Sequence, residues 1–184
     1  MIDEKYADAD TLLVNAVEGI KRTGIRVLAL RDRYAKLLMP LEGNGNHVGM
    51  MYAGSLFTLG EIAGGAIHVV SFDMTRLFPL VKEIHIRFRR PALTDVTMEV
   101  ELSAQEASRI QAEALEKGKA DYVLNLELED ATEAHITAAS RKLHGQRRAP
   151  GAGADNGNLP GRGAYQCFSA ASACCCAAAW RDCM

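Results

Sequence analysis

Cysteine is absent from the first 166 residues of this 184-residue chain. The five cysteines lie between Cys167 and Cys183, and three of them are adjacent. This spacing fits neither a Cys-x-x-Cys zinc site nor a disulfide framework. An unstructured tail explains the cluster better than a soft-metal site, so we expect no metal and no other cofactor.

A strong net charge is also missing. The formal net charge is −2 and the pI is about 6.2. That balance argues against nucleic acid as the main partner. The charged start Met1-Ile2-Asp3-Glu4 lacks the apolar run of a signal peptide, so a cytoplasmic location is expected.

Lysine and hydrophobic periodicity are lost over residues 145–184, which are rich in Gly and Ala. Such a segment buries too little apolar surface to offset the entropy cost of ordering. We predict one domain over residues 1–144, with an N-terminal helix within 1–23, and a disordered or non-native tail over 145–184.

The pattern of residues 1–144 predicts an α+β fold. A helix is expected over 11–20 and a longer apolar helix over about 51–70. Ser103 and Glu106 form a capping-box signature for a further helix that ends near Gly118. Because apolar and polar residues alternate along the strands, the sheet should be antiparallel with one face on the core. Strands are expected over about 25–32, 34–41, 84–88, 96–102, 122–128 and 134–143. A curved sheet wrapped around the long central helix is the simplest arrangement.

Charge is nearly absent from residues 43–72, where Glu61 is the sole formally charged residue. A carboxylate buried without a partner costs several kcal/mol. An acid in an apolar helix is typical of a general base or a nucleophile. Its position is the main sequence evidence for an enzyme. A membrane-spanning helix is the competing interpretation, but the central acid and five glycines disfavour it.

Polar and small residues follow a helical spacing around this acid, at Ser55, Thr58, Glu61, Gly65 and His68. They predict one polar stripe along the helix. The stripe is expected to line a solvated groove or an interface. A hydrogen-bonded stripe between two packed copies of the helix is the alternative.

The start of the same helix offers unpaired backbone N–H groups at about Ala53 and Gly54. Such groups can hold the oxyanion that forms when a carbonyl is attacked. Gly54 and Glu61 are separated by roughly 10 Å along one helix. One carbonyl cannot reach both, so we expect a homodimer, alone or as half of a tetramer, in which each copy supplies one element.

The order Asn46, Gly49, Tyr52-Ala53-Gly54, Leu59-Gly60-Glu61 resembles the motif of hotdog-fold acyl-CoA thioesterases. The closest similarity is to the phenylacetyl-CoA-type (PaaI-like) branch and its DUF4442-like relatives. It covers about residues 25–144 and includes the basic, Pro and Ala residues that follow Phe88. Tyr52 stands where the family pattern has histidine.

The resemblance implies a role for each matching residue. Glu61 would be the general base or nucleophile, Asn46 would orient water or the thioester, and Ala53 and Gly54 would polarise the carbonyl. The acyl group is expected beside Leu56, Phe57 and Leu59. Further substrate contacts are expected from Tyr52, Ser55 and Thr58, and the coenzyme A phosphates are expected on Arg87, Arg89, Arg90, Arg141 or Lys142.

The expected activity is therefore acyl-CoA hydrolysis. A hotdog dehydratase would resemble its relatives in a His-x-x-x-Phe-Pro-Gly element, which the chain lacks. A non-catalytic acyl-CoA-binding or sensing module stays as the alternative, because the same groove could bind a ligand without turning it over.

Overall fold

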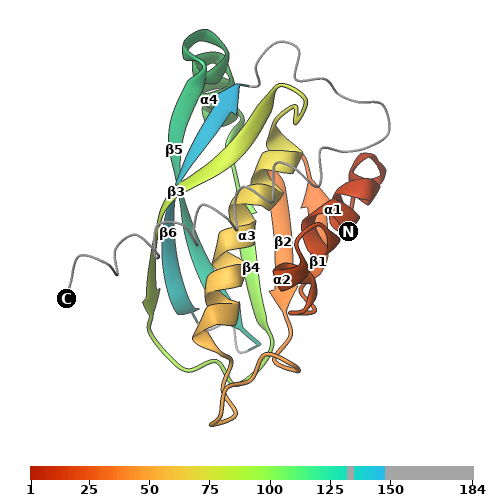
Figure 1. Cartoon of the computed structure of the whole chain (residues 1–184), viewed down its shortest axis with the longest axis vertical. Coiled ribbons are helices and arrows are strands. Elements are labelled where there is room, and N and C mark those ends of the chain that lie inside the picture. The colour runs from red at the N-terminus through yellow and green to blue at the C-terminus, as the bar shows by residue number, and fades with distance from the viewer. Residues whose placement is uncertain (132–134, 148–184) are drawn as a thin grey trace, which may run out of the picture. The chain divides into compact units, whose positions relative to one another are not determined.

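A six-stranded antiparallel sheet forms the body of the protein in a computed structural model (Figure 1). The strand order is β1-β2-β4-β5-β6-β3. The structure describes residues 1–131 and 135–147, without the side chains of Asp10, Ala139 and Arg141. The strands are β1 (Arg26–Arg31), β2 (Tyr34–Met39), β3 (Leu77–Phe88), β4 (Val96–Glu101), β5 (Lys119–Asp130) and β6 (His135–Arg147).

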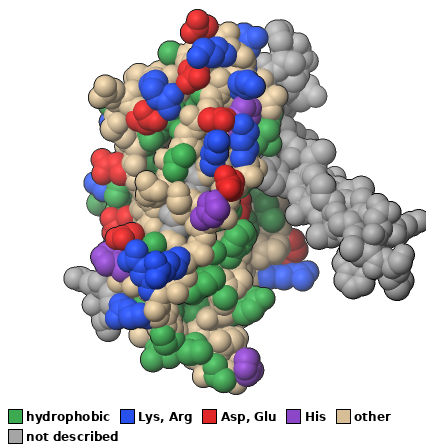
Figure 2. All heavy atoms as spheres, turned by 90° about the vertical axis from the view of Figure 1, so that its left-hand side faces the viewer, with side chains coloured by type: hydrophobic (Ala, Val, Ile, Leu, Met, Phe, Trp, Pro, Cys, Tyr) green, Lys and Arg blue, Asp and Glu red, His purple; other side chains and the backbone are tan. Residues whose placement is uncertain are grey.

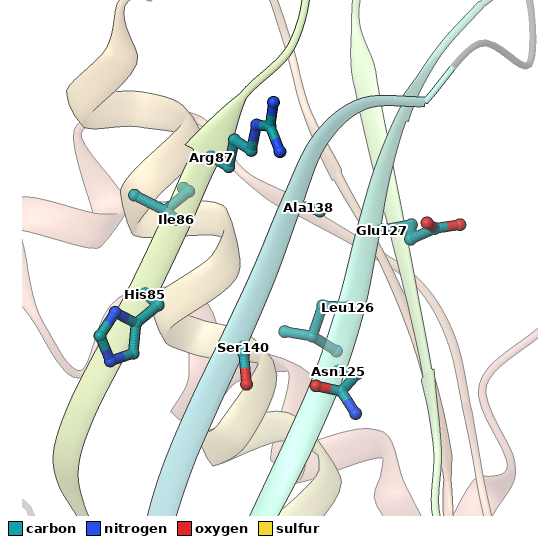
Figure 3. Close-up of a pocket in the computed structure, with 8 residues that line it drawn as sticks. All are labelled: His85, Ile86, Arg87, Asn125, Leu126, Glu127, Ala138 and Ser140. Carbon is teal, nitrogen blue, oxygen red and sulfur yellow. The ribbon is translucent and has the colours of Figure 1, made fainter.

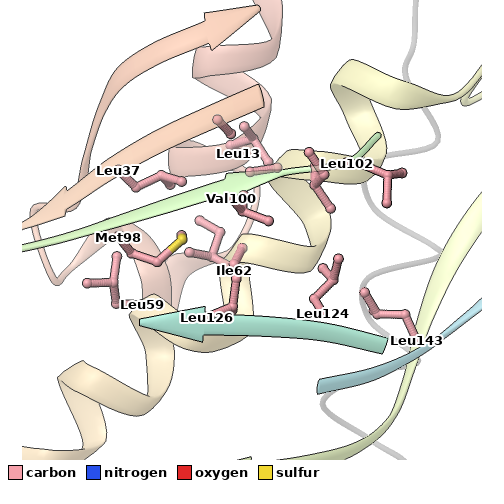
Figure 4. Packing of buried hydrophobic residues seen from close by; sticks show 14 of the residues in the cluster. Leu13, Leu37, Leu59, Ile62, Met98, Val100, Leu102, Leu124, Leu126 and Leu143 are labelled. Atoms are coloured by element: carbon pink, nitrogen blue, oxygen red, sulfur yellow. The ribbon is translucent and has the colours of Figure 1, made fainter. Parts of the chain in front are cut away.

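One long helix, α3 (Ala53–Ser71), lies along the sheet and confirms the predicted central helix (Figure 1). Its buried side packs against leucine, valine and methionine side chains of the strands (Figure 4). By length and composition α3 could span a membrane, but 61% of its most apolar stretch is buried within the described structure. Packing on the sheet therefore accounts for its apolar sequence.

The alternation predicted for the strands is confirmed. In β5 every second residue from Ala120 to Leu128 is buried, and the residues between them are exposed. The same residues pair with β6 in antiparallel register, from Lys119 with Gln146 to Leu128 with Thr137. One face of the sheet thus meets α3, and the other forms the outer face of the molecule.

The helices at the edges of the sheet confirm one prediction and correct another. In α4 (Ala104–Lys117) the Ser103 side chain accepts a hydrogen bond from the Glu106 N–H, and Gly118 ends the helix in the left-handed conformation, as predicted. The single helix expected over 11–20 is wrong. Because Val17 is extended, the segment divides into α1 (Ala7–Asn15) and α2 (Glu18–Lys21). A short 3-10 turn, η1 (Glu4–Tyr6), precedes them.

Two strands are longer than their sequence pattern indicated. β3 begins at Leu77, before the predicted alternation, and β6 continues through Gly145 to Arg147. Residues 148–184 of the predicted tail lie outside the described residues. β3 forms one edge of the sheet and has no strand on its outer side among the described residues.

His68, near the end of α3, is fully buried. Its Nδ1 lies 3.3 Å from the Tyr122 hydroxyl, and its ring lies 4.8 Å from that of Phe72. Burial lowers the pKa of His68 to about 4, and the Leu77 backbone opposes this shift only in part. His68 is therefore a neutral core residue at physiological pH.

We expect His68 to make the protein less stable in mild acid. The unfolded chain binds a proton at this residue near pH 6.5, whereas the native state resists protonation down to about pH 4. The stability that neutral His68 provides is complete above pH 6.5 and is lost as the pH falls toward 4, by up to about 3 kcal/mol. Urea unfolding between pH 4.5 and 7 should show a flatter pH dependence for His68→Gln than for wild type. The exposed His47→Gln is the control, and equal slopes for all three proteins would contradict the prediction.

Candidate active site

The first turn of α3 presents two backbone N–H groups that have no partner in the part of the chain that the structure describes. Tyr52 precedes the helix in an extended conformation, and no side chain caps it. Its carbonyl accepts hydrogen bonds from the N–H groups of Ser55 and Leu56, at 3.0 and 3.2 Å. The N–H groups of Ala53 and Gly54 form no hydrogen bond with the described residues. The predicted position of the open amides therefore agrees with the structure, and the helix dipole adds partial positive charge there.

Glu61 lies on the same side of α3, about two turns further along. In the single chain it is half-buried, and its enclosure in an apolar cavity stays a prediction. Gly54 and Thr58 are half-buried on this side as well, and Phe57 is exposed beside them. We call these residues the open face of α3: Gly54, Phe57, Thr58 and Glu61.

The predicted polar stripe is wrong at its two ends. Ser55 and His68 are buried, Ser55 against the Asn44 side chain and His68 beside Tyr122 and Phe72. The Thr58 hydroxyl remains on the open face and donates to the Gly54 carbonyl at 2.9 Å. Of the five residues in the stripe, Thr58 and Glu61 thus remain half-buried on the open face, whereas Gly65 faces the Leu13 side chain of α1.

Asn46 organises the loop that leads into α3. Its Oδ1 accepts hydrogen bonds from the N–H groups of Val48 and Met50, at 3.0 and 3.1 Å. Its own N–H donates to the Met50 carbonyl at 2.7 Å. These contacts fix the side-chain orientation and leave Nδ2, which has no hydrogen-bond partner among the described residues, as a donor for a bound molecule.

Asn44 is a site residue that the sequence pattern did not reveal. It is only 6% exposed, and its Oδ1 accepts a hydrogen bond from the Ser55 hydroxyl at 3.0 Å. Its carbonyl accepts the Tyr52 N–H at 2.8 Å. In a Gly-Asn-Gly-Asn loop neither asparagine is distinguished from the other, and only the fold shows which one is buried.

Exposed apolar side chains surround the start of α3. Hydrophobic side chains gather toward the lower end in Figure 2, which is the end where α3 begins in Figure 1. The acyl group is expected beside Leu56, Phe57 and Leu59, of which Leu56 and Leu59 are core residues. Phe57 remains available from that set. The exposed apolar residues near the helix start are Val48, Tyr52, Phe57, Phe88 and Leu93.

Arg89 and Arg90 follow β3 and lead toward the start of α3. The Ala92 carbonyl accepts the Met51 N–H at 2.9 Å, so this segment adjoins the loop before the helix. Arg89 lies 3.9 Å from Glu127. Arg90 is exposed and forms no ion pair with the described residues, which makes it the better candidate for binding an anion near the site.

Residues 16–144 match the DUF4442 family, a domain of unknown function. The chain belongs to this family. It is 40% identical to a Pseudomonas aeruginosa protein of unknown function, named a probable thioesterase, with a TM-score of 0.74 over 76% of this chain and 94% of the other. No match was found among curated proteins.

Two more distant structures share the hotdog fold. A thioesterase from Haemophilus influenzae is 14% identical, with a TM-score of 0.59 over 76% of this chain and 88% of its own. A mutant thioesterase from Pseudomonas aeruginosa is 15% identical, with a TM-score of 0.60 over 79% of this chain and 95% of its own. The predicted hotdog architecture is confirmed, and this DUF4442 protein is a thioesterase-type hotdog protein.

A hollow lies on the outer face of the sheet, across β3, β6 and β5 (Figure 3). Its volume is about 750 Å³. His85, Ser140 and Asn125 lie in one row across the three strands. The Glu83 Oε1 lies 2.8 Å from Nε2 of His85. Because the sheet separates this hollow from α3, it shares no residue with the candidate active site.

Tyr52 and Gly54 should be energetically coupled in this DUF4442 protein. A Cβ on Gly54 would clash with Cε1 of Tyr52, a residue that is 58% exposed. Replacing a helical Gly with Ala ordinarily stabilises by about 0.5–1 kcal/mol. We expect that gain for Gly54→Ala in a Tyr52→Ala background but not in wild type, where the ring must move. Urea denaturation of the four proteins measures the difference, and additive effects would contradict the contact.

Proposed function

We propose that this protein hydrolyses acyl-CoA thioesters at the start of α3. The observation that carries the proposal is the pair of open N–H groups on Ala53 and Gly54, on the same side of the helix as Glu61. A thioester carbonyl needs an oxyanion site and one base or nucleophile, and these residues offer both. The 40% identical Pseudomonas relative, named a probable thioesterase, supports the assignment.

In the proposed reaction the thioester oxygen accepts hydrogen bonds from Ala53 and Gly54. Glu61 either takes a proton from water, so that hydroxide attacks the carbonyl carbon, or attacks it directly to form an anhydride that water then cleaves. Collapse of the tetrahedral intermediate breaks the carbon–sulfur bond, and the thiolate leaves and takes a proton. The Asn46 Nδ2 is positioned to hold the water or the thioester.

The substrate is proposed to lie across the exposed apolar and basic residues of the site. The acyl group would contact Phe57 and Tyr52, beside Thr58, on the open face. The coenzyme A phosphates would lie on Arg90, with Arg89 as a weaker candidate because Glu127 is near it. Ser55 would support the site from the buried side of α3 without contacting the substrate.

We further propose that two copies complete each site. Gly54 and Glu61 lie roughly 10 Å apart along α3, so one carbonyl cannot contact the amides and the acid of the same helix. β3 provides a long sheet edge without a strand on its outer side, and such edges are readily extended by another chain. A dimer through this edge, alone or within a tetramer, would bring the open faces of two α3 helices together.

Glu61→Gln tests the acid directly. The variant keeps the size of the side chain and removes the carboxylate, so kcat should fall by about 10²-fold or more while acyl-CoA binding persists. The measurement is a free-thiol assay over a panel of acyl-CoAs, with isothermal titration for binding. Glu116→Gln, an exposed glutamate on α4, is the matched control. A wild type that binds acyl-CoA and hydrolyses none would instead favour a binding or sensing module.

Subunit complementation tests the shared site. Ala53→Pro removes one oxyanion donor but should keep the helix, because proline is favoured at the first helical position and Tyr52 already has the extended backbone that precedes proline. Alone it should lower kcat by about 10²-fold. Mixed and refolded with Glu61→Gln, it should restore about a quarter of wild-type activity, since half of the dimers carry one intact site.

Light scattering on the same samples should give a mass of at least twice the chain mass of 20.0 kDa. An active monomer, or mixed dimers without recovered activity, would contradict the shared site. Hydrolysis within a single chain would then be tested by Glu61→Gln alone.

A further inference from the structure

Asn44 connects the start of α3 to the sheet. Its Nδ2 donates to the carbonyls of Thr23 and Pro40, at 2.6 and 2.9 Å, and lies 3.4 Å from that of Glu42. Thr23 lies shortly before β1, and Pro40 directly follows β2. The side chain is therefore anchored to two segments whose positions the sheet determines.

The other side of Asn44 holds α3. Its carbonyl accepts the Tyr52 N–H at 2.8 Å, and its Oδ1 accepts the Ser55 hydroxyl at 3.0 Å. Tyr52 and Ser55 stand on either side of Ala53 and Gly54 in the sequence. The two open amides thus lie between two residues, Tyr52 and Ser55, that are both hydrogen-bonded to the buried Asn44. We call these two hydrogen bonds the bracket.

We infer that Asn44 is a positioning residue, which through Tyr52 and Ser55 orients the open amides of Ala53 and Gly54 toward a bound carbonyl oxygen. An oxyanion site works because its donors are already in place when charge develops. A displacement of even 1 Å can cost about a hundredfold in rate. No side chain caps α3, so the hydrogen bonds of Asn44 help to fix the direction of its first turn, together with the bond from the Met51 N–H to the Ala92 carbonyl.

The chemistry of the amide side chain explains why asparagine is needed. One end must donate to two carbonyls while the other accepts from a hydroxyl, and only an amide offers both in one group of this size. A carboxylate at this position would face the Thr23 and Pro40 carbonyls with an acceptor. Asn44→Asp should therefore disturb the bracket more severely than loss of the Ser55 hydroxyl.

Ser55→Ala is the sharper test, because it removes one arm of the bracket and leaves the loop in place. Ser103→Ala, which removes a serine hydroxyl at the start of α4, is the matched control. Both should lower the Tm by about 2–4 °C, as expected for losing one hydrogen bond or cap. Only Ser55→Ala should reduce kcat, by about tenfold, with KM within about twofold. Ser55→Thr, which retains a hydroxyl, should recover most of the rate.

This inference rests on the proposed hydrolysis, so a second measurement follows the backbone order of Ala53 and Gly54 without any substrate being turned over. The backbone ¹⁵N order parameters of Ala53 and Gly54 should fall in Ser55→Ala but stay unchanged in Ser103→Ala, while those of Ile62 and Ala63 stay constant in both. Unchanged order at Ala53 and Gly54, or equal kcat in wild type and Ser55→Ala, would overturn the inference. A wild type without hydrolysis would refute the proposed function alone, and the order parameters would still decide the role of Asn44.

Discussion

The burial of α3 against the sheet is the interaction on which the rest of the structure depends. One side of the helix supplies much of the core, including Leu59, Ile67 and Val70. A fully buried aliphatic side chain contributes about 1.5–3 kcal/mol, so this contact fixes the helix firmly. Only the remaining side, with Glu61 and Thr58, is left for a ligand or a partner. The position of the candidate site is thus a consequence of packing.

The start of α3 has a complementary feature. A capping side chain satisfies a first-turn N–H group in α4, whereas the N–H groups of Ala53 and Gly54 in α3 have no partner among the described residues. The missing cap is partly offset by Asn44, which holds the flanking Tyr52 and Ser55. The hydrogen bonds of Asn44 stabilise the residues on either side of Ala53 and Gly54, and the N–H groups of those two residues stay available to a ligand. A helix start that binds an anion requires this arrangement.

Local patterns were sufficient to predict much of this architecture. The alternation around Leu124 and Leu126 identified a strand with one buried face, and the Ser103 capping box located the start of α4. The open amides at Ala53 and Gly54 followed from the position where the apolar helix begins. Each of these features depends on residues close together in the sequence, where hydrogen-bonding and periodicity rules apply directly.

Other features depended on contacts between distant segments. Asn44 is distinguished from Asn46 only by the carbonyls of Thr23 and Pro40, which the fold brings to it. Glu61 was expected to be enclosed because its sequence neighbours are apolar, but exposure depends on what covers that side of α3, and in one chain it is half-buried. Which of the residues along α3 turn toward the sheet could likewise not be decided from their spacing alone.

The aromatic ring of Tyr52 resting against Gly54 constrains how relatives of this chain can diverge. While position 52 carries a large planar side chain in this orientation, a side chain at position 54 requires that ring to move, so glycine is favoured there. A smaller residue at 52 would lift that restriction and open the helix start to alanine or serine. We therefore expect positions 52 and 54 to covary among relatives. In a relative without an aromatic ring at position 52, residues larger than glycine are expected at position 54.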